Sequence, residues 1–254
     1  MPKIEFDGLE INYNHPHDVS GIVEVLVLNV YGSENIRKGD TVVDIGAGIG
    51  DFALLASRRV GTNGRVIAIE PSPEDYATLL LNLKENGIDN IVPLNLAVSD
   101  KSETLKVQFK GKAFDSRAYP MDKILHDLHI NSDALRFIKM DIEGGESKVI
   151  PSSTEIIKRI DFLAMEIHWG YHNSLIPLMS SLGFAFSRVT RKKYLINGLK
   201  TVMSHPFATH SIYRTFKETG EFPGFGKIAS SIGTPQSDDL VIGTFRRQGT
   251  DRII

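Results

Sequence analysis

VVDIGAGIGDF, residues 42–52, joins an apolar run to three glycines in alternate positions, Gly46, Gly48 and Gly50. An apolar run that ends in a glycine-rich turn is typical of a buried parallel strand whose turn leads into a helix and binds a nucleotide. The dinucleotide fingerprint G-x-G-x-x-G requires a glycine three residues after the second one, but Asp51 occupies that position. The turn therefore departs from the pattern of NAD-binding proteins.

The charges around this turn indicate which nucleoside it binds. Asp44 precedes the first glycine by two residues and Asp51 begins the next helix, and both carboxylates would repel the pyrophosphate of a dinucleotide. They would attract the ammonium and sulfonium groups of S-adenosylmethionine. Glu70, which ends the next expected strand, can accept hydrogen bonds from both ribose hydroxyls. The sequence therefore favours a methyl donor over NAD.

Apolar runs and helical patterns alternate along the chain, which predicts a doubly wound α/β fold with a mostly parallel, seven-stranded sheet. The helix after Glu70 has clear boundaries: Ser72 can cap it, Pro73 suits its first position, Asp75 has the spacing of a capping box, and Gly87 ends it. Strands are expected at residues 41–46, 65–70, 90–97, 135–141 and 161–168, with two closing strands in GFAFSRV (183–189) and DDLVIGTFRR (238–247).

The composition is that of an ordinary globular chain, with 254 residues, 41% of them hydrophobic, and a net charge of −2. The absence of cysteine excludes disulfides and fits a cytoplasmic location, and neither a signal peptide nor an apolar stretch of about 18 residues, as a membrane span requires, is visible. We expect one domain, residues 1–254, made of an N-terminal extension (1–35), a cofactor-binding core (36–190), an insertion (190–239) and a closing strand (240–247).

Ligands of such sheets bind at the carboxyl ends of the strands. The side chains that the sequence places there are mostly acidic, and one imidazole, His168, stands among them. Asp141 with Glu143 follows the fourth expected strand, and Glu166 lies near the end of the fifth. The cofactor is expected to contact Asp44, Gly46, Ala47, Gly48, Gly50, Glu70, Pro71, Ala97, Val98 and Asp141.

Methyl transfer to a hydroxyl oxygen requires that the hydroxyl lose its proton, and a base with a pKa near neutrality favours this step. His168 is the expected base, and Asp141 and Glu143 are expected to orient its ring or to hold the amino group of the donor. A divalent metal on Asp141, Glu166 and His168 is an alternative. No local spacing fixes such a site, so the sequence favours a base that acts without a metal. A strand-capping role for His168, and a solvated helix start for Glu143 and Glu146, are the structural alternatives.

Several segments occur in the order found in one enzyme family: VVDIGAGIGDF (42–52), IAIEPSPEDYATLLLNLKENG (67–87), LAVSD (96–100), FIKMDIEGGE (137–146) and MEIH (165–168). Over about residues 36–190 the chain resembles the FkbM family of methyltransferases, and KMDIEGGE followed by EIH is the most specific part. The resemblance implies the class I methyltransferase fold and methyl transfer from S-adenosylmethionine to a hydroxyl oxygen of a sugar or polyketide-like acceptor. Ala47-Gly48 replaces the family's usual Ala-Asn, a departure that leaves the expected cofactor unchanged.

The insertion differs in charge from the rest of the chain. Between Ser187 and Arg247, ten lysines and arginines stand against four acidic residues. Its length, its glycines and its aromatic residues favour a lid over the acceptor, with an aromatic minicore as the structural alternative. Basic and aromatic residues together also describe a surface that stacks RNA bases.

Three functions therefore remain. The favoured one is O-methylation of a small hydroxylated acceptor, with no membrane partner. The second is an RNA methyltransferase that uses the basic insertion, against which the overall charge and the absence of an N-P-P-[YF]-like motif argue. The third is a non-catalytic protein that binds S-adenosylmethionine, which Asp141, Glu143 and His168 on the acceptor side argue against.

Overall fold

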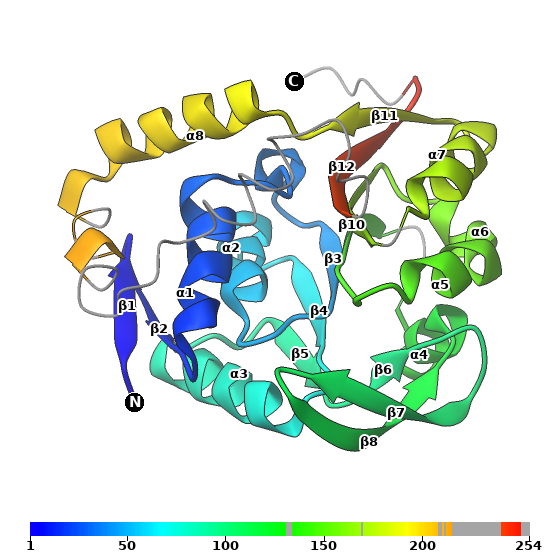
Figure 1. Ribbon diagram of the computed structural model, residues 1–254, viewed down its shortest axis with the longest axis horizontal. Helices are drawn as coiled ribbons and strands as arrows, with labels where there is room; N and C mark the ends of the chain where they lie inside the picture. The colour runs from blue at the N-terminus through cyan, green and yellow to red at the C-terminus, as the bar shows by residue number, and fades with distance from the viewer. Residues whose placement is uncertain (131–133, 169, 208–209, 211, 215–239, 250–254) are drawn as a thin grey trace.

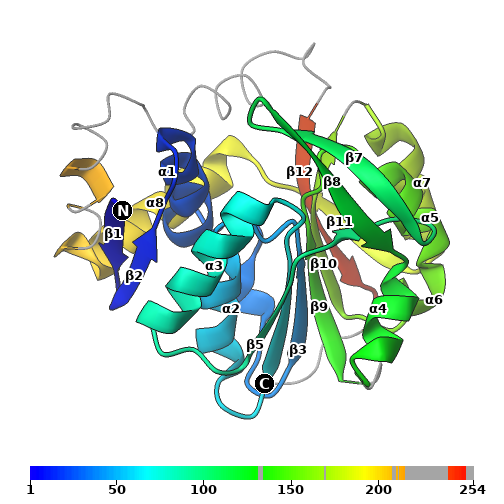
Figure 2. The ribbon, with the colours of Figure 1, turned by 90° about the horizontal axis from the view of Figure 1, so that it is seen from below.

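The computed structural model describes residues 1–130, 134–168, 170–207, 210, 212–214 and 240–249. Its centre is a seven-stranded sheet with helices on both faces (Figures 1 and 2). The strands stand in the order β5 (Ile91–Leu94), β4 (Arg65–Ile69), β3 (Thr41–Ile45), β9 (Leu135–Met140), β10 (Phe162–His168), β12 (Leu240–Arg247) and β11 (Phe184–Arg188). Only β12 runs antiparallel to its neighbours in this sheet, and the other pairings are parallel. The expected class I methyltransferase fold is confirmed.

Side chains alternate along each strand, so the sheet separates two apolar layers. Val42 packs into one layer and Val43 into the other, and both are fully buried. Figure 2 shows the two sets of helices on opposite sides of the sheet. The first layer contains α1 (Pro16–Ile22), the π-helix η1 (Val23–Val27), α2 (Asp51–Val60) and α3 (Pro73–Glu85). The second contains α4 (Met121–Asp127), α5 (Glu146–Ser152), α6 (Thr154–Ile157) and α7 (His172–Ser181).

The start of α3 follows the sequence prediction, but the expected capping box is not formed. Ser72 caps the helix by accepting a hydrogen bond from the backbone N–H of Asp75 at 3.3 Å, and Pro73 is its first residue. The carboxylate of Asp75 contacts Lys110 rather than completing a capping box. Asp75 is therefore available for a contact between distant segments.

The strand predicted at residues 90–97 is wrong in its second half. β5 ends at Leu94, at the edge of the sheet, and the side-chain amide of Asn95 then donates to the backbone oxygens of Glu70 and Pro71. These bonds turn the chain away from the sheet. The next residues form β6 (Ala97–Val98), which joins β8 (Lys112–Tyr119) and β7 (Glu103–Phe109) in a separate sheet of order β6-β8-β7.

The N-terminal extension is folded onto the core. It forms the hairpin of β1 (Lys3–Phe6) and β2 (Leu9–Asn12), followed by α1, η1 and the short 3-10 helix η2 (Ser33–Asn35). The fully buried amide of Asn82 on α3 accepts from the backbone N–H of Asn12 at 2.8 Å and donates to the backbone oxygen of Ile49 at 2.8 Å. One buried side chain therefore connects the extension, α3 and the glycine turn.

The insertion begins with regular structure. Its first part is the helix α8 (Arg191–Ser204), which Thr190 caps by accepting from the N–H of Lys193. Asn197 and Thr201 donate to the backbone oxygens of Leu28 and Val27, at 2.9 Å each, where η1 ends. Most of the remaining insertion, residues 215–239, and therefore most of the predicted lid, lies outside the described residues. Within the described part of the chain, the structure contains no helix with the length and apolar character of a membrane span.

Candidate active site

The glycine turn between β3 and α2 depends on close backbone packing. The N–H groups of Gly46 and Ala47 both donate to the backbone oxygen of Ile69, at 2.9 Å each. A Cβ atom on Gly46 would lie 1.8 Å from the backbone oxygen of Asp141, and one on Gly50 would lie 2.4 Å from Leu79 on α3. A side chain at either position would therefore push apart the segments that the turn joins. Both glycines also have a positive φ, a conformation that strains any larger residue.

A cavity of about 300 Å³ lies at the carboxyl ends of β3, β4 and β9. Asp51, Glu143 and Glu166 line this cavity. Most of the residues expected to contact the cofactor also line it: Gly46, Ala47, Gly48, Glu70, Pro71, Ala97, Val98 and Asp141. Asp44, Gly50 and His168 lie outside the set of lining residues. Asp44 and Gly50 lie behind the wall, and His168 lies beside the lining residues Glu143 and Glu166.

Asp44 is fully buried beneath the turn, where it is paired with Lys139. The ammonium of Lys139 lies 3.2 Å from Asp44 Oδ1 and donates to the backbone oxygen of Gly46 at 2.6 Å. Burial raises the pKa of Asp44, and Lys139 opposes the rise. Burial alone would lower the pKa of Lys139, but Asp44, Asp141 and Asp51 raise it overall. A lysine inside the apolar run LRFIKMD was the signal that could have revealed this cation.

The carboxylate of Glu70 bridges the glycine turn and the residue that caps α3. Oε2 accepts from the N–H of Gly48 and Oε1 from the N–H of Ser72, at 2.7 Å each. Burial raises the pKa of Glu70 to about 7 in spite of these two hydrogen bonds. Asp51, at the start of α2, also has its pKa raised by burial, to about 6. The end of the cavity at the turn is therefore acidic, with carboxylates that change charge near neutral pH.

His168 ends β10 in a ring of carboxylates. Its Nδ1 lies 3.3 Å from Oε1 of the fully buried Glu146, and its Nε2 lies 3.5 Å from Glu143 and 3.8 Å from Glu166. Burial would lower the pKa of His168, but Glu146, Asp141 and Glu166 raise it to about 9. From the sequence, Asp141 and Glu143 were expected to orient the imidazole ring, but Glu146 also contacts it, at Nδ1. Glu146 is buried, so it is not the solvated helix start that the sequence left open.

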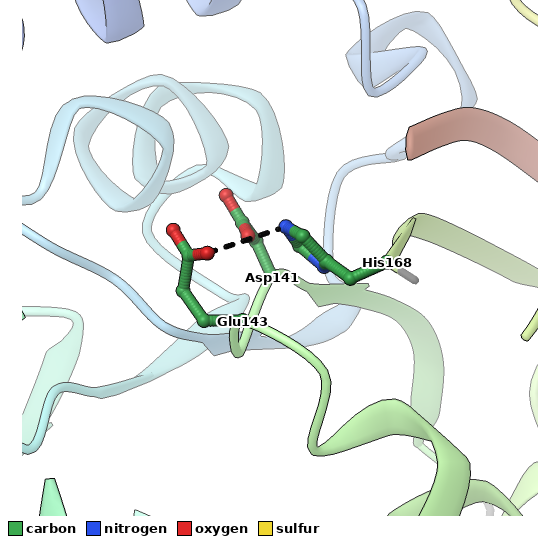
Figure 3. A group of neighbouring side chains, drawn as sticks. All are labelled: Asp141, Glu143 and His168. Carbon is green, nitrogen blue, oxygen red and sulfur yellow. Dashed lines mark ion pairs between the residues drawn. The ribbon is translucent and has the colours of Figure 1, made fainter. Parts of the chain in front are cut away.

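Asp141, Glu143 and His168 come together as the sequence predicted (Figure 3). Each offers one potential ligand atom, and these atoms lie within 4.8 Å of one another. Carboxylate oxygens with an imidazole nitrogen form a donor set that suits a divalent cation as well as proton transfer. The metal site considered from the sequence contained Glu166 with Asp141 and His168, whereas the cluster in the structure contains Glu143 in place of Glu166.

Tyr31 is a site residue that the sequence reasoning missed. Its hydroxyl lies 3.1 Å from Glu166 Oε1 and 3.2 Å from Asp141 Oδ2, and the side chain is buried. Burial, followed by the charges of Glu166 and Asp141, raises the pKa of this phenol, so it stays protonated and can donate. No local pattern connects Tyr31 with the strand ends, because the extension reaches them only through the tertiary fold.

The wall of the cavity offers the groups that S-adenosylmethionine needs. A Cβ atom on Gly48 would meet no protein atom within 4 Å, so the turn leaves open space beside its backbone. Glu70 offers carboxylate oxygens to ribose hydroxyls, and Asp51 and Asp141 offer negative charge to the ammonium and sulfonium groups.

Comparison with known proteins gives relatives of one chemical class. A hexuronic acid methyltransferase, AglP, of Haloferax volcanii is 26% identical over 147 residues, which are 54% of this chain and 59% of that protein. A probable cobalt-precorrin-6B C(15)-methyltransferase (decarboxylating) of Saccharolobus solfataricus is 28% identical over 174 residues, 65% of this chain and 71% of that one. Among solved structures, a putative rRNA methylase from Clostridium thermocellum matches with a TM-score of 0.48 and 11% identity, over 92% of this chain and 97% of its own.

The family itself is shown by a match to the methyltransferase FkbM domain over residues 44–186. This region is more than half of the chain and includes the end of β3, the glycine turn, Glu70, Asp141 and His168. S-Adenosylmethionine is the cofactor of this fold, and the residues around the cavity fit it. The chain belongs to the FkbM family of methyltransferases.

Proposed function

We propose that this chain transfers the methyl group of S-adenosylmethionine to a hydroxyl oxygen of a small, sugar-like acceptor. When bound, the donor supplies a methyl group on a positively charged sulfur. The observation that carries the proposal is one cavity whose wall includes the glycine turn, Glu70, Asp141 and Glu143, with His168 beside Glu143. The hexuronic acid methyltransferase of Haloferax volcanii supports a sugar-like acceptor.

The residues of the turn hold the donor in this proposal. The backbone of Gly46, Ala47 and Gly48 would hold it, the Glu70 carboxylate would accept hydrogen bonds from its ribose hydroxyls, and Asp141 would contact its amino group. Pro71, Ala97 and Val98 line the part of the wall that would contact the adenine ring of the donor. Asp44 and Gly50 act from behind the wall, because Asp44 fixes Lys139 and Gly50 admits Leu79 of α3.

His168 accepts the proton of the acceptor hydroxyl at Nε2, while Glu146 holds Nδ1. Asp141 and Glu143 line the cavity next to this ring, and Glu143 orients the hydroxyl. The pKa of about 9 makes the deprotonated imidazole a stronger base than an ordinary histidine. It also keeps most of the ring protonated at neutral pH, so the reactive form increases as the pH rises.

An assay with a panel of acceptors tests the proposal. The protein is incubated with methyl-labelled S-adenosylmethionine and, separately, with hexuronic acids, neutral sugars, hydroxylated polyketides and tRNA. Label in an ether of a sugar or polyketide hydroxyl is the expected result. Label in the carboxylate of a hexuronic acid keeps the methyltransferase activity but contradicts the hydroxyl acceptor.

RNA is the second candidate acceptor because Lys192 and Lys200 are exposed on α8, within the basic segment. Label in tRNA, with binding that weakens steeply as salt increases, would favour this candidate over the sugar.

A further inference from the structure

A hairpin outside the central sheet forms one wall of the cavity. β7 pairs antiparallel with β8 along its whole length, and the end of β8 joins β6 (Figure 1). Leu105, Val107 and Phe109, which are alternate residues of β7, line the cavity together with Phe114 of β8. The apolar face of the hairpin thus covers the space that the proposed function assigns to the donor.

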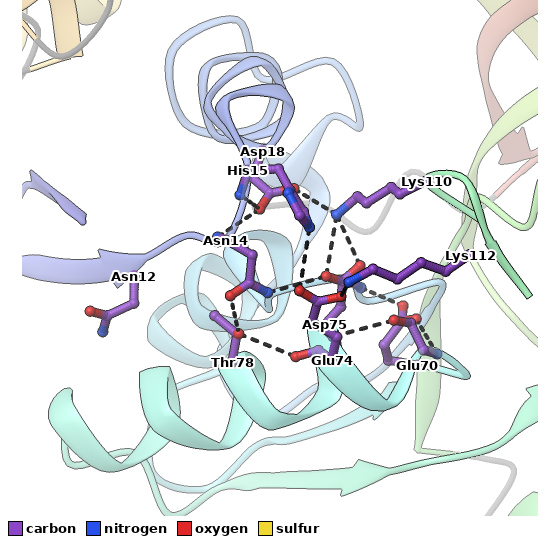
Figure 4. A network of polar contacts seen from close by, with 12 residues as sticks. Asn12, Asn14, His15, Asp18, Glu70, Glu74, Asp75, Thr78, Lys110 and Lys112 are labelled. Carbon is purple, nitrogen blue, oxygen red and sulfur yellow. Dashed lines mark hydrogen bonds and ion pairs between the residues drawn. The ribbon is translucent and has the colours of Figure 1, made fainter. Parts of the chain in front are cut away.

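The tip of the hairpin reaches two helices of the first layer (Figure 4). The ammonium of Lys110 lies 2.7 Å from Asp18 Oδ1 on α1 and 3.0 Å from Asp75 Oδ2 on α3. The side chains of Asp18 and Asp75 are 5% and 2% exposed, and that of Lys110 is 19% exposed. Lys110 therefore joins three elements, distant in sequence, through ion pairs that are largely shielded from water.

The two carboxylates form a fixed socket for this ammonium. The backbone N–H groups of Asn14 and His15 donate to Asp18 Oδ2, at 2.9 and 3.0 Å, and the side-chain amide of Asn14 contacts Asp75 Oδ1. Burial alone would lower the pKa of Lys110, but Asp18 and Asp75 raise it overall. Because buried carboxylates are strongly destabilised without a counter-charge, the socket favours the position of the hairpin in which Lys110 is inserted.

The backbone of Lys110 is unusual for its residue type. Lys110 and Gly111 form a two-residue turn between the paired Phe109 and Lys112, and both turn residues have positive φ, 49° and 74°. Such turns favour Asn, Asp or Gly at the first position, and a lysine there is strained. The ion pairs with the socket give a physical reason for a lysine in this strained position.

A second hollow adjoins the tip of the hairpin. Its lining consists of His15, His17, Gln108, Phe109, Lys110 and Glu143. All of these except His15 also line the cavity, so residues 108–110 form a wall that the two spaces share. One space contains the glycine turn, and both include Glu143, which the proposed function places beside the acceptor hydroxyl.

We infer that the β7–β8 hairpin is a clamp over the methyl donor and that Lys110 is the positioning residue that latches it to Asp18 and Asp75. The inference rests on the proposed function, because it takes the cavity as the donor site. With the latch closed, the hairpin covers the donor, and Phe109 and Lys110 complete the hollow through which the acceptor approaches Glu143. Exchange of S-adenosylhomocysteine for fresh donor requires Lys110 to leave its socket.

Dissociation of S-adenosylhomocysteine from the full-length protein tests the latch. Lys110→Met should increase the dissociation rate constant about tenfold or more, since it removes the ion pairs that close the clamp. Lys110→Arg retains the charge and should restore a rate near that of the wild type. Lys112→Met is the matched control: Lys112 forms an exposed ion pair with Glu74 at the same tip and should change the rate less than about twofold.

A double-mutant cycle separates the latch from a general loss of packing. If Lys110 acts through its socket, Asp18→Asn should also accelerate dissociation, and the double variant should be no faster than Lys110→Met alone. Equal rates in Lys110→Met and Lys112→Met, or additive effects in the cycle, contradict the clamp. If Lys110→Met does not fold, the rate of Asp18→Asn decides in the same way. A wild type that does not bind S-adenosylhomocysteine in calorimetry overturns the donor site itself, whereas binding with unchanged rates overturns only the clamp.

Discussion

Glu70→Gln tests the physical account of the carboxyl at the end of β4. Burial raises its pKa to about 7 from an ordinary value of 4.5, although Gly48 and Ser72 donate to it. A carboxyl whose pKa is higher in the folded state binds protons more tightly there than in the unfolded chain. Its contribution to stability is therefore fully present below pH 4.5 and is lost as the pH rises through about 7.

The size of this loss follows from the shift. One pKa unit corresponds to about 1.4 kcal/mol, so between about pH 5 and about pH 8 this group should lower the unfolding free energy of the wild type by about 2 to 3 kcal/mol. Glutamine does not titrate. Its NH₂ group cannot accept the second backbone N–H, which costs about 1 to 3 kcal/mol at every pH.

Urea unfolding followed by circular dichroism at both pH values measures the effect. The variant should gain about 2 to 3 kcal/mol relative to the wild type between about pH 5 and about pH 8. The constant cost of the lost hydrogen bond and the titrations of Asp51 and His168 cancel in this comparison. Glu74→Gln, at an exposed carboxylate four residues away, is the control and should show no such gain. A difference between variant and wild type that stays constant with pH would refute the assignment of a buried, raised pKa to Glu70.

Three further predictions concern the chemistry and the buried charges. His168→Ala should reduce turnover by about 10²- to 10⁴-fold with little change in donor affinity, and full turnover in this variant would rule out His168 as the base. The wild-type rate should fall on acidification from about pH 9, because carboxylates raise the pKa of His168. Exhaustive chelation should leave the activity unchanged, and activity that disappears and returns with Mg²⁺ or Mn²⁺ would instead assign Asp141, Glu143 and His168 to a metal. Lys139→Met should destabilise the fold by about 3 to 5 kcal/mol in chemical unfolding, since it leaves Asp44 buried without its cation. The double variant with Asp44→Asn should recover part of this loss, and an unchanged stability of Lys139→Met would contradict the pairing.

The sequence was sufficient for the parts of the fold that depend on local pattern. Continuous apolar runs located the strands of the central sheet to within a few residues, and Ser72 with Pro73 located the start of α3. The run 90–97 misled because no local signal shows that Asn95 binds the backbone after β4 and turns the chain away from the sheet.

The candidate site was predictable only where its residues lie at strand ends. Topology brings Asp141, Glu143 and His168 together, so their positions after β9 and in β10 were enough to group them. Tyr31 and Lys110 enter through the N-terminal extension and the hairpin, whose tertiary contacts no periodicity encodes. The carboxylates that gather around His168 likewise depend on the fold, so the sequence did not reveal that they raise the pKa of this imidazole to about 9.

The central claim is that the cavity beside the glycine turn holds S-adenosylmethionine with its ribose on Glu70. Calorimetric titration of the wild type and of Glu70→Ala with S-adenosylhomocysteine, with NAD as the competing ligand, tests it most directly. The account predicts one site for S-adenosylhomocysteine, weaker binding of NAD, and a loss of about 1.5 to 3 kcal/mol of binding free energy in Glu70→Ala, the range for a hydrogen bond to a charged group. Unchanged affinity in Glu70→Ala, or a preference of the wild type for NAD, would contradict it.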